Sequence, residues 1–244
     1  MDLSITKHVI LIWAVSGLII LLTLFGTARY RNKKNALPSK FSSLFEILID
    51  FVRKDLVIPN IGKSHATRWT PLIATFFLFI LFSNFLGLIP YLELLPGGSG
   101  TITGNFAVTG ALALITFVAI IIAGTMKHGF IGHWKNMIPG GVPAPVLLIL
   151  IPVEIMGMFI KPLALLLRLG ANMTAGHIGM VAIFGLPYLV HLSMGDSIGF
   201  GVGFVSVMLT TALYFLEMIV CMVQAYVFAL LSSVFIGMAI HAEH

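Results

Sequence analysis

The stretch "PVLLILIPVEIMGMFIKPLALLLRLGANMTAGHIGMVAIF" (Pro145–Phe184) decides the fold, because it is nearly all apolar and yet contains an arginine. One membrane-spanning helix needs roughly 20 apolar residues. The apolar region continues to Ile240, so it holds at least two spans. Since 185–197 contains Gly, Pro and Asp, we expect helices over 145–184 and 198–241 with a turn between them. The charged residues of the whole region are Glu154, Lys161, Arg168, Asp196 and Glu217.

The composition of the whole chain indicates an integral membrane protein. Its 244 residues are 59% apolar and 9% charged, whereas a soluble domain carries roughly a quarter charged residues. The mean hydropathy of +1.06 agrees. We expect one membrane domain over 1–244. The net charge of +5 does not indicate nucleic acid, because nine of the 14 Lys and Arg residues fall between Arg29 and Arg68. That clustering is typical of cytoplasm-facing loops beside anionic lipids.

Three further spans are predicted before the hairpin, over 8–28, 70–91 and 105–126, giving an all-α protein of about five membrane helices. The segment 41–58 has an apolar face and several charges, so we expect it to lie in the membrane interface. The charge bias places the N-terminus outside and the C-terminus in the cytoplasm. Basic residues follow the first apolar run, so we interpret it as a retained helix and not a cleaved signal. Each arm of the hairpin has about 40 residues, twice a perpendicular span, which predicts strong tilt.

Polar residues follow one stripe on each arm of the hairpin. Glu154, Lys161 and Arg168 are spaced by seven residues, which returns to nearly the same helix face. Asn172 lies close to that stripe. On the second arm Glu217 and Gln224 are also seven apart, with Tyr214 and Cys221 nearby. Such stripes are expected where helices line an aqueous path or meet a polar partner.

Arg168 has few purely structural explanations. A guanidinium cannot be neutralised at ordinary pH, and burying it without a partner costs several kcal/mol. His177 lies about half a turn away, where antiparallel arms would bring it toward Glu217 as a titratable pair. Lys161 and Glu154 each have an explanation that needs no functional role. Lys161 could extend its ammonium to the interface, and Glu154 could be an ordinary interfacial acid. Three glycines are expected to allow close helix approach: Gly170, Gly176 and Gly179.

The sequence contains no recognisable enzymatic constellation. Its histidines lack metal-ligand spacing, no Gly-rich loop opens a helix as a P-loop does, and no Ser-His-Asp set is suggested. We therefore expect a non-catalytic protein with no cofactor and no metal. A secondary transporter would show repeated halves or broken helices, which are not evident. An ion channel and a structural assembly subunit remain as alternatives, although the latter has no need of Arg168.

Four motifs carry a resemblance to a known family. "LRLGANMTAGH" (Leu167–His177) resembles the arginine helix of subunit a of F-type ATP synthases, the stator component that works against a rotating ring of c subunits. "SNFLGLIP" (Ser83–Pro90) is similar to the helix-two signature of that family, and "QAYVFALLS" (Gln224–Ser232) to its last-helix motif. Lys161–Pro162 precedes the arginine by seven residues. The resemblance covers most of the chain from Gly62 onward.

This resemblance implies a function for Arg168. The arginine would deprotonate the passing c-ring carboxyl between two offset half-channels, and so couple proton flow to rotation and ATP synthesis. His177 and Glu217 keep the acid–histidine pair of the family with the residue types exchanged. The implied proton-translocation residues are Arg168, Asn172, His177, Glu217, Gln224 and Glu154. Further channel-lining candidates are Asn84, Asn105, Lys161 and Tyr214.

The resemblance also implies partners, although the sequence departs from the pattern of the family at three positions. The expected partners are the c-subunit ring, b-type peripheral stalk subunits and membrane lipids, within an FoF1 complex of a bacterial plasma (inner) membrane. The chain itself would be a non-catalytic subunit. Proton is the expected ion, with sodium left open because selectivity resides mostly around the ring carboxyl. Asn105 stands where many relatives have an acid, Gly87 where some have an acid, and Ala164 where some have serine.

Overall fold

The computed structural model describes residues 7–32, 40–89, 102–129, 132, 144–194 and 196–241, without the side chains of Glu154 and His177 among others. Within these residues all regular structure is helical. Five helices are long and apolar enough to cross a membrane, which confirms the predicted all-α membrane fold. They are α1 (Lys7–Asn32), α4 (Lys63–Gly87), α5 (Phe106–His128), α7 (Ala144–Met194) and α8 (Asp196–Ile240).

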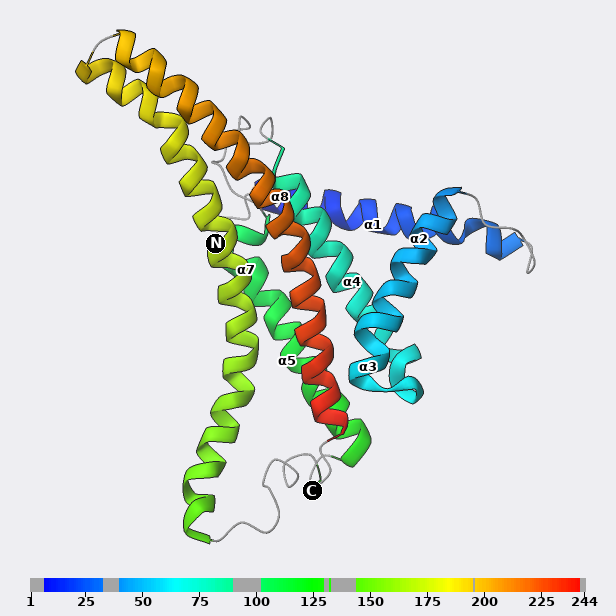
Figure 1. The fold of residues 1–244 in the computed structure, drawn as a ribbon. Coiled ribbons are helices and arrows are strands. Elements are labelled where there is room, and N and C mark those ends of the chain that lie inside the picture. The colour runs from blue at the N-terminus through cyan, green and yellow to red at the C-terminus, as the bar shows by residue number, and fades with distance from the viewer. Residues whose placement is uncertain are drawn as a thin grey trace, which may run out of the picture.

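The helices form a bundle with a long hairpin at one side. Figure 1 shows α8 beside α4 and α5, with α7 running along α8, while α1 crosses the bundle and extends away from it. The main hydrophobic core lies where α4 meets the second half of α8, and there the rings of Phe76 and Phe228 pack edge to face at 5.6 Å. This core holds α8 in place while one face of it remains turned toward α7.

The hairpin α7–α8 is longer than the sequence predicted. At 51 and 45 residues the arms measure about 76 and 68 Å, more than twice the ~30 Å hydrocarbon thickness. The turn predicted over 185–197 is helical as far as Met194. Pro187 has no N–H for the carbonyl of Ile183, and the hydroxyl of Ser206 on α8 donates to that carbonyl instead. Cross-helix hydrogen bonding therefore allows the helix to continue through a proline that we interpreted as a turn former.

The amphipathic segment 41–58 is also longer than predicted, and its second half belongs to the bundle. It consists of α2 (Lys40–Phe51), a π-helical stretch η1 (Val52–Val57) and α3 (Ile58–Ile61). Leu44 and Ile47 on α2 are exposed, whereas Val52 and Leu56 are fully buried against the core. The carbonyl of Leu56 accepts hydrogen bonds from Ser233 Oγ at 2.6 Å and Asn60 Nδ2 at 2.7 Å. These bonds satisfy backbone that the π-helix leaves irregular.

The ends of α3, α5 and α8 meet at the end of the bundle where α4 begins. His241 Nε2 donates to the carbonyl of Ile61 at 3.0 Å, and His128 Nε2 donates to that of Ile240 at 3.1 Å. A Cβ on Gly237 would overlap the carbonyl of Asn60, so only glycine allows α8 to approach this closely. Between α3 and α4 the chain reverses at Gly62, whose φ of 88° is in the region that favours glycine.

Candidate functional site

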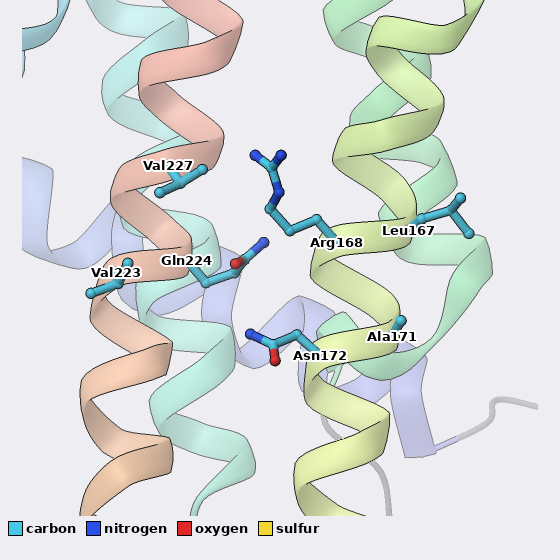
Figure 2. A pocket seen from close by; sticks show the side chains of 7 residues that line it. All are labelled: Leu167, Arg168, Ala171, Asn172, Val223, Gln224 and Val227. Atoms are coloured by element: carbon cyan, nitrogen blue, oxygen red, sulfur yellow. The ribbon is translucent and has the colours of Figure 1, made fainter.

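Arg168, Asn172 and Gln224 converge in an open pocket between α7 and α8. Figure 2 shows Arg168 and Asn172 projecting from α7 toward α8, with Gln224 projecting back from α8 into the space between them. The pocket has a volume of about 720 Å³. Its other lining residues are Leu167, Ala171, Val223 and Val227. The structure thus brings together three side chains that the sequence placed on two separate stripes.

The pocket surrounds the arginine with amides rather than with acids. Gln224 is only 5% exposed, while Arg168 is exposed in the isolated chain. Among the described side chains, no carboxylate forms an ion pair with Arg168. Amides hydrogen-bond a guanidinium or water without adding charge. Within the described pocket, the polar neighbours of the guanidinium are thus the amides of Asn172 and Gln224.

Glu217 lies two turns before Gln224 on α8, where its carboxyl group faces the backbone of α7. The residue is 6% exposed. A Cβ built on Gly176 would lie 2.5 Å from Glu217 Oε1, so the absence of a side chain at Gly176 provides the space for this carboxyl. Gly176 immediately precedes His177, whose side chain lies outside the described residues. The predicted pairing of His177 with Glu217 therefore stays a prediction.

Two of the three glycines predicted to allow close helix approach have a close neighbour in the structure, and one does not. A Cβ on Gly170 would come within 3.0 Å of the Phe106 ring, and one on Gly176 would meet Glu217, which confirms the prediction for both. Gly179 has nothing within 4 Å of a built Cβ, so the prediction was wrong there.

Lys161 continues the polar stripe of α7 toward α8. Its ammonium lies over the ring of Phe235, 5.8 Å from the centroid, which is within cation–π range. Lys161 and Arg168 thus both face α8, and they share one face of α7 as their spacing of seven predicted. Glu154 lies in α7, but its side chain is outside the described residues, so its predicted position at the inner mouth stays a prediction.

Asn84 connects three elements from a fully buried position at the end of α4. Its Nδ2 donates to the carbonyl of Cys221 on α8 at 3.2 Å, and its Oδ1 accepts from Thr103 Oγ1 at 2.6 Å. Thr103 lies in the short 3₁₀ helix η3 (Ile102–Gly104) and is also fully buried. Thr103 was not among the predicted site residues, because its only signal was a hydroxyl group shortly before the third span. Tyr214 donates its hydroxyl to the carbonyl of Leu88, directly after α4.

Asn105 has a local structural role. It is the N-cap of α5, and its Oδ1 accepts from the backbone N–H of Ala107 at 2.9 Å. Asparagine is among the preferred residues at this position because its oxygen satisfies a helix N–H that has no other partner. Whether Asn105 and Asn84 also line a channel stays a prediction.

In the part of the chain that the structure describes, no group of three His, Cys, Asp or Glu side chains could hold a metal ion. The described site is a charged, amide-lined pocket in a helical hairpin. Together with the five spans, it defines the class of protein as a multi-pass membrane protein with a polar pocket between its two longest helices.

Comparison with known proteins identifies the family. The family described as ATP synthase A chain matches residues 9–237. The chain is 43% identical to ATP synthase subunit a of Myxococcus xanthus, over 100% of the chain and 75% of that protein. Identity is 40% with subunit a of Chloroherpeton thalassium, over 100% of the chain and 69% of the relative. Identity with ATP synthase subunit a of Anaeromyxobacter dehalogenans is 40%, over 97% of the chain and 58% of that relative. The chain belongs to the ATP synthase subunit a family.

Proposed function

We propose that this chain is the proton-translocating stator subunit of an F-type ATP synthase, with Arg168 as the group that deprotonates each passing c-ring carboxyl. The observation that carries the proposal is the position of Arg168 in an open pocket lined by Asn172 and Gln224. Membership of the subunit a family supports it. The chain itself is then non-catalytic, and ATP synthesis takes place elsewhere in the FoF1 complex.

The physical role of Arg168 follows from its permanent charge. A ring carboxyl facing lipid stays protonated, because the ionised form would lose its hydration. A guanidinium about 4 Å away stabilises the carboxylate by about 4 kcal/mol at an effective dielectric constant of ~20. That attraction favours release of the proton as the carboxyl reaches the pocket. Because the pocket is open to water, the attraction is screened enough for the ring to move on.

The remaining polar residues suit the two half-channels. Glu217 and His177 each have a side chain that can take up and release a proton, and they form the relay on the outer side. Glu154 accepts or releases protons at the inner mouth. Arg168 lies between them and repels any cationic proton carrier, which prevents a continuous leak. Each proton that crosses supplies roughly 2.3 kcal/mol per 100 mV, in addition to the pH difference.

The proposed setting is a bacterial plasma membrane, with the N-terminus outside and the C-terminus in the cytoplasm. The ends of α3, α5 and α8 meet where Lys63 and Lys127 lie, so the basic residues of these segments gather at one end of the bundle. That end is the cytoplasmic one under the positive-inside rule. The c-ring faces α7 and α8, and b-type stalk subunits and lipids complete the surroundings.

The decisive experiment replaces Arg168 in the assembled complex. Inverted vesicles carrying Arg168→Ala should lose ATP-driven acidification and show altered passive proton permeability, while the ring still assembles. Arg53→Ala is the matched control, because it also removes one guanidinium but from the exposed part of η1, outside the pocket. Arg53→Ala should pump as wild type does. Unimpaired pumping by Arg168→Ala would show that the arginine is structural and would overturn the proposal.

A further inference from the structure

We infer that Asn84 and Thr103 are positioning residues that set the rotation of α8, and thereby aim Glu217 and Gln224 at α7. The inference rests on the proposed function and adds a residue pair to it. Its basis is a set of buried hydrogen bonds that join α4, η3 and α8 next to the site. Neither Asn84 nor Thr103 lines the described pocket.

Two contacts hold the same face of α8 against the end of α4. Cys221 offers its carbonyl to Asn84, and Tyr214 donates its hydroxyl to Leu88. Tyr214 and Cys221 are seven residues apart, so they share one stripe at points about 10 Å apart along the helix. Leu88 and Cys221 are also packed in one small hydrophobic cluster with Met173 of α7. Two fixed points on one stripe leave α8 little freedom to rotate.

We call the line of Tyr214 and Cys221 the held stripe of α8. The functional stripe, formed by Glu217 and Gln224, is adjacent to it. Glu217 follows Tyr214 by three residues, and Gln224 follows Cys221 by three, which places the second stripe about 60° around the helix. A side-chain end about 6 Å from the axis moves by ~2 Å when the helix turns by about 20°. A displacement of that size would remove the carboxyl of Glu217 from its space beside Gly176. The amide of Gln224 would move out of the pocket by a comparable distance.

An asparagine is suited to position 84 because the side chain there donates one hydrogen bond and accepts another at the same time. Its nitrogen donates to the Cys221 carbonyl while its oxygen accepts from Thr103. Both Asn84 and Thr103 are 0% exposed, so water does not replace either bond. An ionised aspartate could not donate, and leucine could do neither. On the Thr103 side serine keeps the hydroxyl, whereas valine keeps the shape and loses it.

Cys221 provides a built-in probe of the rotation. It is the only cysteine of the chain and is fully buried on the held stripe. In assembled wild-type complex, a small membrane-permeant maleimide should label it slowly. Thr103→Val should speed labelling at least about tenfold and reduce ATP-driven proton pumping at least about fivefold relative to ATP hydrolysis, as expected for loss of one buried bond. Thr103→Ser keeps the hydroxyl, so its labelling rate and its proton pumping should match those of wild type. Asn84→Leu loses both hydrogen bonds, so it should speed labelling and reduce pumping more than Thr103→Val does.

A matched control separates rotation from general loss of stability. Thr116→Val removes a buried hydroxyl that lies 3.4 Å from Ser232 Oγ, so it also weakens contact with α8, but three turns beyond Cys221. This variant should keep wild-type labelling and coupling. Unchanged labelling in Thr103→Val, or faster labelling with unchanged pumping, would overturn the inference. The labelling readout does not depend on transport, so failure of the Arg168 experiment would remain distinguishable.

Discussion

The spans of α4 and α7 are both apolar, yet their surroundings within the chain are opposite. Half of the best membrane window of α4 (Lys63–Gly87) is buried inside the protein, against 6% of the window in α7 (Phe159–Ser193). α4 packs on α8 and on the segment from Val52 to Ile61, whereas α7 contacts its own chain along one side. The charged Arg168 lies on the helix that its own chain covers least. Substitutions around α4 should therefore change stability, and substitutions on α7 should change function.

The largest effect is expected where two backbones touch. Gly237→Leu would force α8 away from the carbonyl of Asn60, an overlap beyond the 1–3 kcal/mol typical of overpacking, so assembled complex should fall more than about tenfold. Gly179→Leu on α7 has open space and should assemble normally. The amount of subunit recovered in purified complex measures both. Equal recovery of the two variants would contradict the contrast between the bundle core that surrounds α4 and the little-covered α7.

A core cavity should have the next effect. Phe228→Ala removes a fully buried ring that packs on Phe76, and such truncations destabilise by about 3–5 kcal/mol. Phe184→Ala on α7 removes a ring that is 69% exposed, and it should change the free energy of unfolding by less than ~0.5 kcal/mol. Thermal unfolding of the purified complex compares them. A comparable loss in Phe184→Ala would mean that a partner subunit packs on that ring.

Gly176→Ala should separate function from stability on α7 itself. The added Cβ would lie 2.5 Å from Glu217 Oε1 and displace the carboxyl. We expect ATP-driven acidification to fall about tenfold, since one misplaced proton-relay group removes a step from the path, with assembly unchanged. Gly185→Ala, where a built Cβ has open space, is the control on the same helix. Normal pumping by Gly176→Ala would argue against Glu217 as a relay.

The hydrogen bond at the end of α8 should matter moderately. His241→Ala leaves the carbonyl of Ile61 without the ring nitrogen that bonds it at 3.0 Å. The expected loss is about 0.5–1.5 kcal/mol of stability, with proton pumping unaffected. The midpoint of thermal unfolding checks the loss. A change in pumping without a change in this midpoint would give His241 a role in transport instead.

The smallest effect is expected at the exposed pair Lys54–Asp50, whose charged atoms are 2.6 Å apart. The hydrogen bond and charge of Asp50 raise the pKa of Lys54 above its usual 10.5. A raised pKa contributes stability that is present below pH 10.5 and is lost as pH rises through the folded value. Because both groups are exposed and screened by solvent, that contribution is too small to detect, so Lys54→Gln should leave thermal unfolding unchanged at pH 7 within error. A clear loss at pH 7 would show that a partner buries this pair.

Sequence patterns predicted the fold and part of the site for identifiable reasons. Apolar length alone fixes the existence of a span, so all five were found. Spacing by seven correctly set Lys161 and Arg168 on a common face, but it did not show that this face turns toward α8. The pattern began the hairpin turn of 185–197 too early, because α7 stays helical to Met194 and α8 begins at Asp196. Ser206 of α8 bonds the carbonyl that Pro187 leaves open, and no local signal shows a partner on another helix. Thr103 was missed for the same reason, since its bond to Asn84 joins residues 19 positions apart.

The sequence by itself determined that this chain is an all-α integral membrane protein, that one hairpin carries a permanent positive charge, and that its motifs resemble those of subunit a. The first two follow from composition and periodicity, and the third from short motifs that resemble those of the family. All three are local properties of the chain. Only the tertiary structure decided which stripe of α8 faces α7, where Gly176 leaves space for Glu217, and which helix remains uncovered. These depend on the rotation of packed helices, which is set by contacts between residues far apart in the sequence.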